Sequence, residues 1–229
     1  AGVTQRIIRL ALAVVGHVRG SLAQVNVLGS VMMAGVSGSG AADTAALGTV
    51  LIPEMEKKGY SRSYAVAVTA ASATIGPIIP PSVLFVVYGS LTNVSVGALF
   101  LGGVLPGVLM GALMMVVAYY TSRRRGYQQE VAKFSWSELG AASLGGLAAA
   151  VVPAIIVGAI FFGIATATEV GVIAVVVSML LGVVAFGRLR GFRELAGVLT
   201  RSLTTSAAIL LIIGTSGLFA NVLTRLQFQ

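Results

Sequence analysis

Residues 35–43, with the sequence GVSGSGAAD, interrupt an otherwise uncharged, helix-forming stretch. The first six of these residues include three glycines and two serines, which are poor helix formers. The arms on either side of the break are each about 15 residues long, or about 22 Å of helix, so neither spans a bilayer core of about 30 Å. The tract therefore predicts a re-entrant helical hairpin over 21–58 with a polar tip.

Asp43 closes this tract and allows two interpretations. Aspartate is a preferred N-cap residue, and its charge is stabilised by the positive end of a helix dipole. We expect Asp43 to cap a second helical arm over 44–58. The alternative is a carboxylate that belongs to a sodium site.

A second interruption lies at 72–82, with the sequence SATIGPIIPPS, inside the uncharged run 64–91. Proline removes a backbone donor and clashes with the carbonyl four residues earlier. Three prolines and one glycine within six residues predict a broken helix over 59–95 whose freed carbonyls line a site. The alternative is a kinked packing helix, but the flanking hydroxyls of Ser72, Thr74 and Ser82 favour a site.

The composition predicts an all-α, polytopic membrane protein. The chain is 57% apolar and only 10% charged, whereas soluble domains carry about a quarter charged residues. Charge-free runs occur at 64–91, 98–120, 139–163, 170–187 and 202–224. Buried helices of a large soluble protein would need charged faces that these runs lack. We expect four further transmembrane helices within 96–229.

The basic residues predict the topology, because Lys and Arg accumulate on the cytoplasmic side of membrane proteins. If 21–58 enters and returns, 14 of the 15 Lys and Arg residues lie on the cytoplasmic side, whereas a single crossing leaves 11 there. The net charge of +8 is therefore explained by topology, and no nucleic-acid partner is expected. The clusters are Arg6, Arg9 and Arg19; Lys57, Lys58 and Arg62; Arg123, Arg124, Arg125 and Lys133; and Arg188, Arg190, Arg193 and Arg201, with Arg225 alone on the other side.

The segment 1–20 is predicted to be an amphipathic arm helix in the membrane interface. At about 100° per residue, one face carries polar residues and the other apolar ones. The alternative is the start of a transmembrane helix. His17, the only histidine, is expected to be solvated, with a proton relay as its alternative. The polar face is Gln5, Arg6, Arg9 and His17, and the apolar positions are Ile7, Leu10, Val14 and Val18.

A hairpin tip that faces a broken helix is a recurring feature of secondary transporters, in which carbonyls and hydroxyls bind sodium. The sodium site is predicted at Ser37, Gly38, Ser39, Thr74, Gly76 and Pro77, and the wider ion and substrate site adds Asp43, Pro80, Pro81 and Ser82. No nucleophile elbow, phosphate loop or metal-ligand cluster is present in the sequence, so no enzyme activity and no cofactor beyond this ion are expected. A channel and a purely structural membrane subunit are the weaker hypotheses.

The run 35–82, GVSGSGAADTAALGTVLIPEMEKKGYSRSYAVAVTAASATIGPIIPPS, closely resembles the large membrane subunit of tripartite ATP-independent periplasmic (TRAP) transporters. The stretches 97–107, GALFLGGVLPG, and 163–169, GIATATE, are also similar to that family. One departure is Ala167, where the family usually has proline. Glu169 is expected to cap the helix that follows. The runner-up is a secondary transporter of another family with similar broken helices.

The resemblance implies sodium-driven import of carboxylate-bearing solutes by an elevator movement, in the bacterial or archaeal inner membrane. It implies two partners, a periplasmic solute-binding protein and a small membrane subunit. It also implies two inverted repeats, of which this chain is expected to hold about one and the start of the second. The chain begins at Ala1 and ends at Gln229, and we expect it to be a piece cut from a longer polypeptide, truncated at both ends and unable to transport alone.

Overall fold

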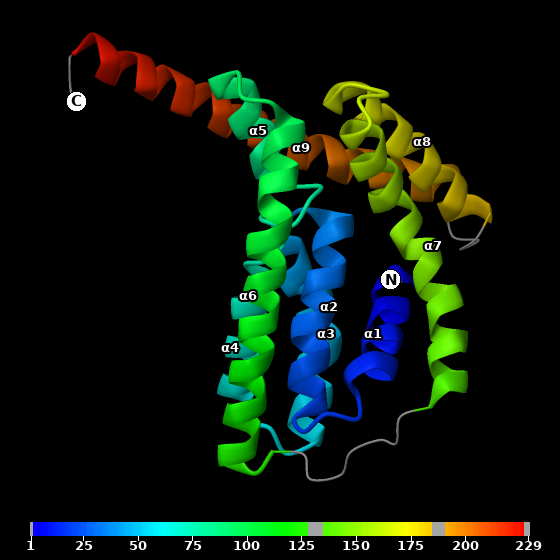
Figure 1. The fold of residues 1–229 in the computed structure, drawn as a ribbon. Helices are drawn as coiled ribbons and strands as arrows, with labels where there is room; N and C mark the ends of the chain where they lie inside the picture. The colour runs from blue at the N-terminus through cyan, green and yellow to red at the C-terminus, as the bar shows by residue number, and fades with distance from the viewer. Residues whose placement is uncertain (1, 128–134, 185–190, 227–229) are drawn as a thin grey trace.

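The computed structural model describes residues 2–127, 135–184 and 191–226, and its regular elements in these ranges are all helices (Figure 1). This confirms the all-α fold class. The helices are α1 (Gly2–Val15), α2 (Ser21–Ser37), α3 (Gly40–Lys57), α4 (Arg62–Ala73), α5 (Val83–Thr92), α6 (Val96–Arg125), α7 (Trp136–Phe161), α8 (Ala167–Val184) and α9 (Phe192–Arg225).

Helices α2 and α3 form a hairpin whose break lies at Gly38 and Ser39 (Figure 1). Gly38 has φ 61° and ψ 15°, a left-handed conformation that glycine adopts without strain. Ser39 is extended, and its Oγ accepts a hydrogen bond from the backbone N–H of Ala42 at 3.5 Å. The expectation that Asp43 is the N-cap is therefore wrong. The helix starts at Gly40, because Ser39 already supplies the cap, and Asp43 lies within the first turn.

The second break separates α4 from α5, and its hydrogen bonds follow from the prolines. An α-helix would pair the carbonyls of Ala73, Gly76 and Pro77 with the nitrogens of residues 77, 80 and 81, which are prolines without an N–H. The Ala73 carbonyl instead accepts from the Gly76 N–H at 3.0 Å. Ser82 then caps α5 by accepting from the Phe85 N–H at 3.3 Å.

Helix α1 packs against α2 and α7, and a narrow apolar stripe on it is buried. Ile7, Ile8 and Ala11 are buried against side chains of α2 and α3, whereas Val14 is 39% exposed. The buried stripe is thus rotated from the predicted apolar face, because packing on two neighbouring helices selects its position. The placement of α1 in a membrane interface stays a prediction.

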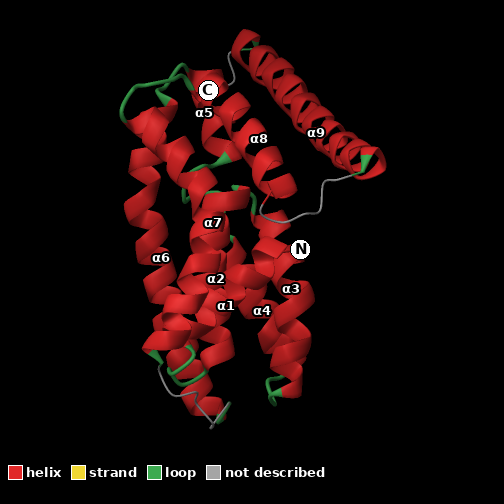
Figure 2. Ribbon diagram, turned by 90° about the vertical axis from the view of Figure 1, so that its right-hand side faces the viewer, coloured by secondary structure: helices red, strands yellow, loops and turns green. Residues whose placement is uncertain are grey.

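Helices α6 to α9 carry much of the exposed apolar surface. Within the described ranges, two helices are long and apolar enough to cross a membrane, Val96–Arg125 and Glu194–Arg225. Helices α6 and α7 run along the bundle, whereas α9 is inclined to it and lies at the upper right in Figure 2. The start of α2, the end of α3 and the end of α6 lie at the same end of the bundle (Figure 1). Lys133, Arg188 and Arg190 lie outside the described residues.

Candidate functional site

The hairpin tip and the break of α4–α5 lie in direct backbone contact. A β-carbon at Gly40 would lie 2.6 Å from the carbonyl oxygen of Ala73, and one at Gly38 would collide with the carbonyl of Pro81. The missing side chains of these two glycines therefore allow the two interrupted elements to approach each other. A β-carbon at Gly35, one turn earlier in α2, would lie 3.9 Å from the Pro80 carbonyl oxygen, which is an ordinary contact distance.

Asp43 is the buried carboxylate at this crossing, with 0% of its surface exposed. Its Oδ1 accepts a hydrogen bond from the Ser37 hydroxyl at 2.5 Å. The same hydroxyl oxygen accepts the backbone N–H of Ser39 at 3.2 Å, which fixes the serine in the tip. Ser37 is therefore the residue that orients Asp43.

The second oxygen of Asp43 has no such partner. Oδ2 is buried and receives no hydrogen bond from the residues that the structure describes. It lies against the break, because a β-carbon at Gly76 would be 2.6 Å from Oδ2 and 3.1 Å from the Gly40 nitrogen. A buried and unsatisfied carboxylate oxygen is costly, and a cation or a proton relieves that cost.

The remaining predicted residues occupy different positions around the crossing. Among the described residues, the Thr74 and Gly76 carbonyls accept no backbone hydrogen bond. The Pro77 carbonyl accepts a hydrogen bond from the Ser82 hydroxyl at 2.6 Å, so Ser82 stabilises the backbone of the break. The side chain of Thr74 is exposed and donates to the Ala71 carbonyl at 2.6 Å, so its hydroxyl does not join the Ser37–Asp43 pair.

A pocket of about 510 Å³ opens beside the tip and the break. Ser37, Ser39 and Pro77 line it from the two interrupted elements, and α5 contributes Val83 and Val87. Helix α9 adds a further wall with Thr205, Ile209 and Ile213. This wall was not predicted from the sequence, although the polar residues 204–206 within an apolar run are a signal for it.

Three glycines on one face of α6 allow close packing, two of them against the broken helix and the third against α2. A β-carbon at Gly103 would collide with the Ile78 carbonyl and the Phe85 ring, and one at Gly107 would collide with Ile79. At Gly111 it would lie 2.7 Å from Cγ2 of Val31. Their four-residue spacing shows from the sequence that they share one helix face. The residues that pack against this face are known only from the structure.

A buried hydrogen-bond network joins α2 to α4 below the site. Asn26 Nδ2 donates to Thr69 Oγ1 at 2.7 Å, and the hydroxyls of Ser30 and Ser72 are 2.8 Å apart. The Ser72 hydroxyl also lies 3.3 Å from Asn26 Oδ1. All four residues are buried. The hairpin arm and the first half of the broken helix are therefore held together by polar contacts as well as by packing.

Comparisons with known proteins agree on one family. A family model described as the DctM component of the tripartite ATP-independent periplasmic transporter matches residues 1–229. The chain is 37% identical to the sialic acid TRAP transporter large permease protein SiaM of Vibrio cholerae, over 99% of this chain and 53% of that protein. It is 37% identical to the C4-dicarboxylate TRAP transporter large permease protein DctM of Pseudomonas aeruginosa, over 99% of this chain and 52% of that protein.

A third relative is the isethionate TRAP transporter permease protein DctMQ of Oleidesulfovibrio alaskensis, which is 33% identical over 97% of this chain and 35% of that protein. These names are those of transporter permeases and not of enzymes, as the sequence predicted. The chain spans about half the length of the SiaM and DctM relatives, 53% and 52%.

Proposed function

The chain belongs to the family of the DctM component of tripartite ATP-independent periplasmic transporters, and from this membership and the site geometry we propose that it forms part of a sodium-coupled importer of carboxylate-bearing solutes. In this proposal the chain contributes one hairpin and one broken helix to the complete large subunit. The large subunit works in the bacterial or archaeal inner membrane with a small membrane subunit, and a periplasmic protein delivers the solute.

The unpartnered Oδ2 of Asp43 is the observation that carries the proposal. A sodium ion beside Oδ2 balances the buried negative charge of Asp43 and replaces the missing hydrogen bond. We assign the Gly76 carbonyl as a neutral ligand, because it accepts no backbone hydrogen bond in the described structure and its residue lies against Oδ2. We assign the remaining coordination to the tip residues Ser37, Gly38 and Ser39 and to the carbonyls of Thr74 and Pro77.

The donor chemistry favours sodium over other metal ions. The ligands offered here are hydroxyl, carbonyl and carboxylate oxygens, which suit a hard cation. A single carboxylate balances one positive charge, whereas calcium sites in proteins commonly combine several carboxylates. Entry of a sodium ion is also driven electrically, by about 2.3 kcal/mol per charge for each 100 mV.

Two helix N-termini support the carboxylate assignment for the solute. Helices α3 and α5 begin at Gly40 and Val83, and both residues line the 510 Å³ pocket. The positive end of a helix dipole attracts an anionic group. The names of the similar transporters include sialic acid and C4-dicarboxylates, which are carboxylic acids.

The α2–α4 network supports an elevator movement. Hydrogen bonds from Asn26 to Thr69 and between Ser30 and Ser72 hold the hairpin and the half-helix as one unit. The proposed ion site lies at the end of this unit. The residues of the site can therefore move together and keep their mutual contacts. We propose that the hairpin and the broken helix shift together during transport.

Replacement of the driving ion tests this function. The complete large subunit, with its small subunit and its binding protein, is reconstituted in vesicles and supplied with a carboxylate solute that the binding protein retains. We expect solute accumulation with an inward sodium gradient and none with potassium at the same membrane potential. Equal accumulation with a proton gradient in the absence of sodium would overturn sodium coupling.

A further inference from the structure

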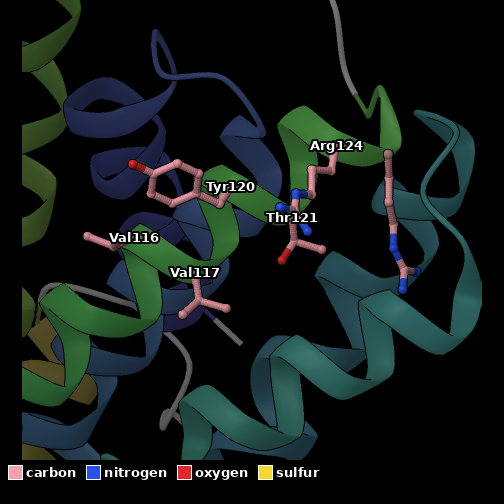
Figure 3. Close-up of a pocket in the computed structure, with 6 residues that line it drawn as sticks. Val116, Val117, Tyr120, Thr121 and Arg124 are labelled. Carbon is pink, nitrogen blue, oxygen red and sulfur yellow. The ribbon is translucent and has the colours of Figure 1, made fainter.

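A second pocket, of about 460 Å³, lies along the last turns of α6 (Figure 3). The hairpin tip lies toward the other end of the bundle (Figure 1). Its residues repeat every four positions, so they form two adjacent rows on the helix surface. The two rows end in an arginine pair and begin in a valine pair about 12 Å away, at 1.5 Å per residue. The lining residues are Val116, Val117, Tyr120, Thr121, Arg124 and Arg125.

The basic end of the pocket has no carboxylate partner among the described residues. Two acidic residues of α3 near this end already have basic partners, Glu54 with Lys57 at 2.7 Å and Glu56 with Arg62 at 3.5 Å. Arg125 is oriented by the Tyr127 hydroxyl, to which it donates at 3.5 Å, and lies 5.7 Å from the centre of the Tyr64 ring. Two cationic side chains therefore face the pocket without a neutralising carboxylate.

The other end of the pocket is apolar and open. Val116 and Val117 are 51% and 64% exposed, and Tyr120, one helical turn closer to the arginines, is 60% exposed. An amphipathic tyrosine is typical of the level at which lipid headgroups meet acyl chains. The pocket thus offers, in order along one helix, an apolar surface, an aromatic ring and two positive charges.

We propose that this pocket binds an anionic phospholipid of the cytoplasmic leaflet. Its phosphate pairs with Arg124 and Arg125, its glycerol region lies against Tyr120, and an acyl chain covers Val116 and Val117. Charge complementarity selects the lipid, because basic residues at the cytoplasmic end of a transmembrane helix attract anionic headgroups. A soluble phosphate ion would leave the valine end uncovered, so it accounts for only half of the pocket.

Native mass spectrometry of the complete transporter tests the lipid site. The protein is extracted from nanodiscs that contain phosphatidylglycerol and phosphatidylcholine at equal amounts. We expect retained phosphatidylglycerol on the unmodified protein, and a decrease of about fivefold in its occupancy for Arg124→Gln. Arg124→Lys should keep most of the occupancy, because the charge is retained.

Arg123→Gln is the matched control, since Arg123 neighbours Arg124 but does not line the pocket. An equal loss in this control would show a diffuse charge effect and overturn the site. Equal retention of the two lipids, or unchanged occupancy in Arg124→Gln, would also overturn it. If Arg124→Gln instead releases the small membrane subunit at unchanged lipid occupancy, the pocket binds a protein. The melting temperature of each variant should equal that of the unmodified protein. This shows that a difference in lipid occupancy does not come from loss of folding.

Discussion

The free carboxylate oxygen of Asp43 lies against the backbone of Gly76, so closely that a β-carbon at position 76 would be 2.6 Å from it. Asp43 belongs to the hairpin tip and Gly76 to the break of the second element. Both interruptions thus meet at one buried oxygen that has no hydrogen-bond partner among the described residues. The proposed ion site depends on this contact.

Gly76→Ala should weaken sodium binding by intruding on that oxygen. The added methyl group occupies space beside Oδ2, so Asp43 or the ion must shift. We expect the sodium concentration for half-maximal uptake to rise about tenfold, which corresponds to about 1.4 kcal/mol. Sodium-dependent uptake by the complete transporter measures this change.

The matched control for that substitution is Gly35→Ala. A β-carbon at Gly35 would make only ordinary contacts, with the nearest atom of Pro153 at 3.6 Å. Its sodium dependence should remain close to that of the unmodified protein. If the two variants shift the sodium dependence equally, the contact between Gly76 and Asp43 has no special role.

Ser37→Ala removes the hydroxyl that orients Asp43 at 2.5 Å. A hydrogen bond to a charged group contributes about 1.5–3 kcal/mol, so the half-maximal sodium concentration should rise by about tenfold or more. Ser90→Ala is the control, because the Ser90 hydroxyl is exposed and only donates to the Val87 carbonyl within its own helix. If Ser37→Ala keeps the sodium dependence of the unmodified protein, the Ser37 hydroxyl does not contribute to sodium binding and this serine is a packing residue.

Gly103→Ala should displace the break, because its β-carbon collides with the Ile78 carbonyl and the Phe85 ring. We expect a lower rate of uptake and a lower melting temperature. Gly102→Ala, one residue earlier in the same helix, meets no atom within 4 Å and should behave like the unmodified protein. Equal melting temperatures for the two variants would show that the glycine face does not hold the broken helix in place.

Single cysteines test the topology of the hairpin. Cysteines at Arg19, Lys58, Arg124 and Arg190 should react only with reagents on the cytoplasmic side, and cysteines at Thr92 and Ala167 only with external reagents. The start of α2 and the end of α3 lie at the same end of the bundle, as this outcome requires (Figure 1). If a cysteine at position 19 reacts with external reagents, the hairpin prediction is wrong and 20–42 is a spanning helix.

Both helix breaks could be predicted from the sequence, because glycine and proline act on the backbone of their own segment. The left-handed Gly38 and the lost donors of Pro77, Pro80 and Pro81 are local effects of this kind. The cap was predicted wrongly, because Ser39 and Asp43 are both good capping residues and only the start of the helix at Gly40 decides between them.

The partners of the site could not be predicted in the same way. The packing of Gly103 against Ile78, the Asn26–Thr69 hydrogen bond and the wall at Thr205 join segments distant in the sequence. Such contacts depend on how the helices pack, which a single sequence does not determine. In each case the sequence shows which residue type is present, but it does not show which residue from another helix contacts it.

Sodium binding to the purified complete transporter, followed by titration calorimetry, tests the proposed site most directly when Asp43→Asn is compared with the unmodified protein. Asparagine keeps an acceptor for the Ser37 hydroxyl but replaces the free, charged Oδ2 with a neutral amide. We predict that the half-saturating sodium concentration rises by at least about tenfold, while the melting temperature in potassium is unchanged or higher because no charge is buried. The same sodium affinity in both proteins would contradict a sodium site at Asp43.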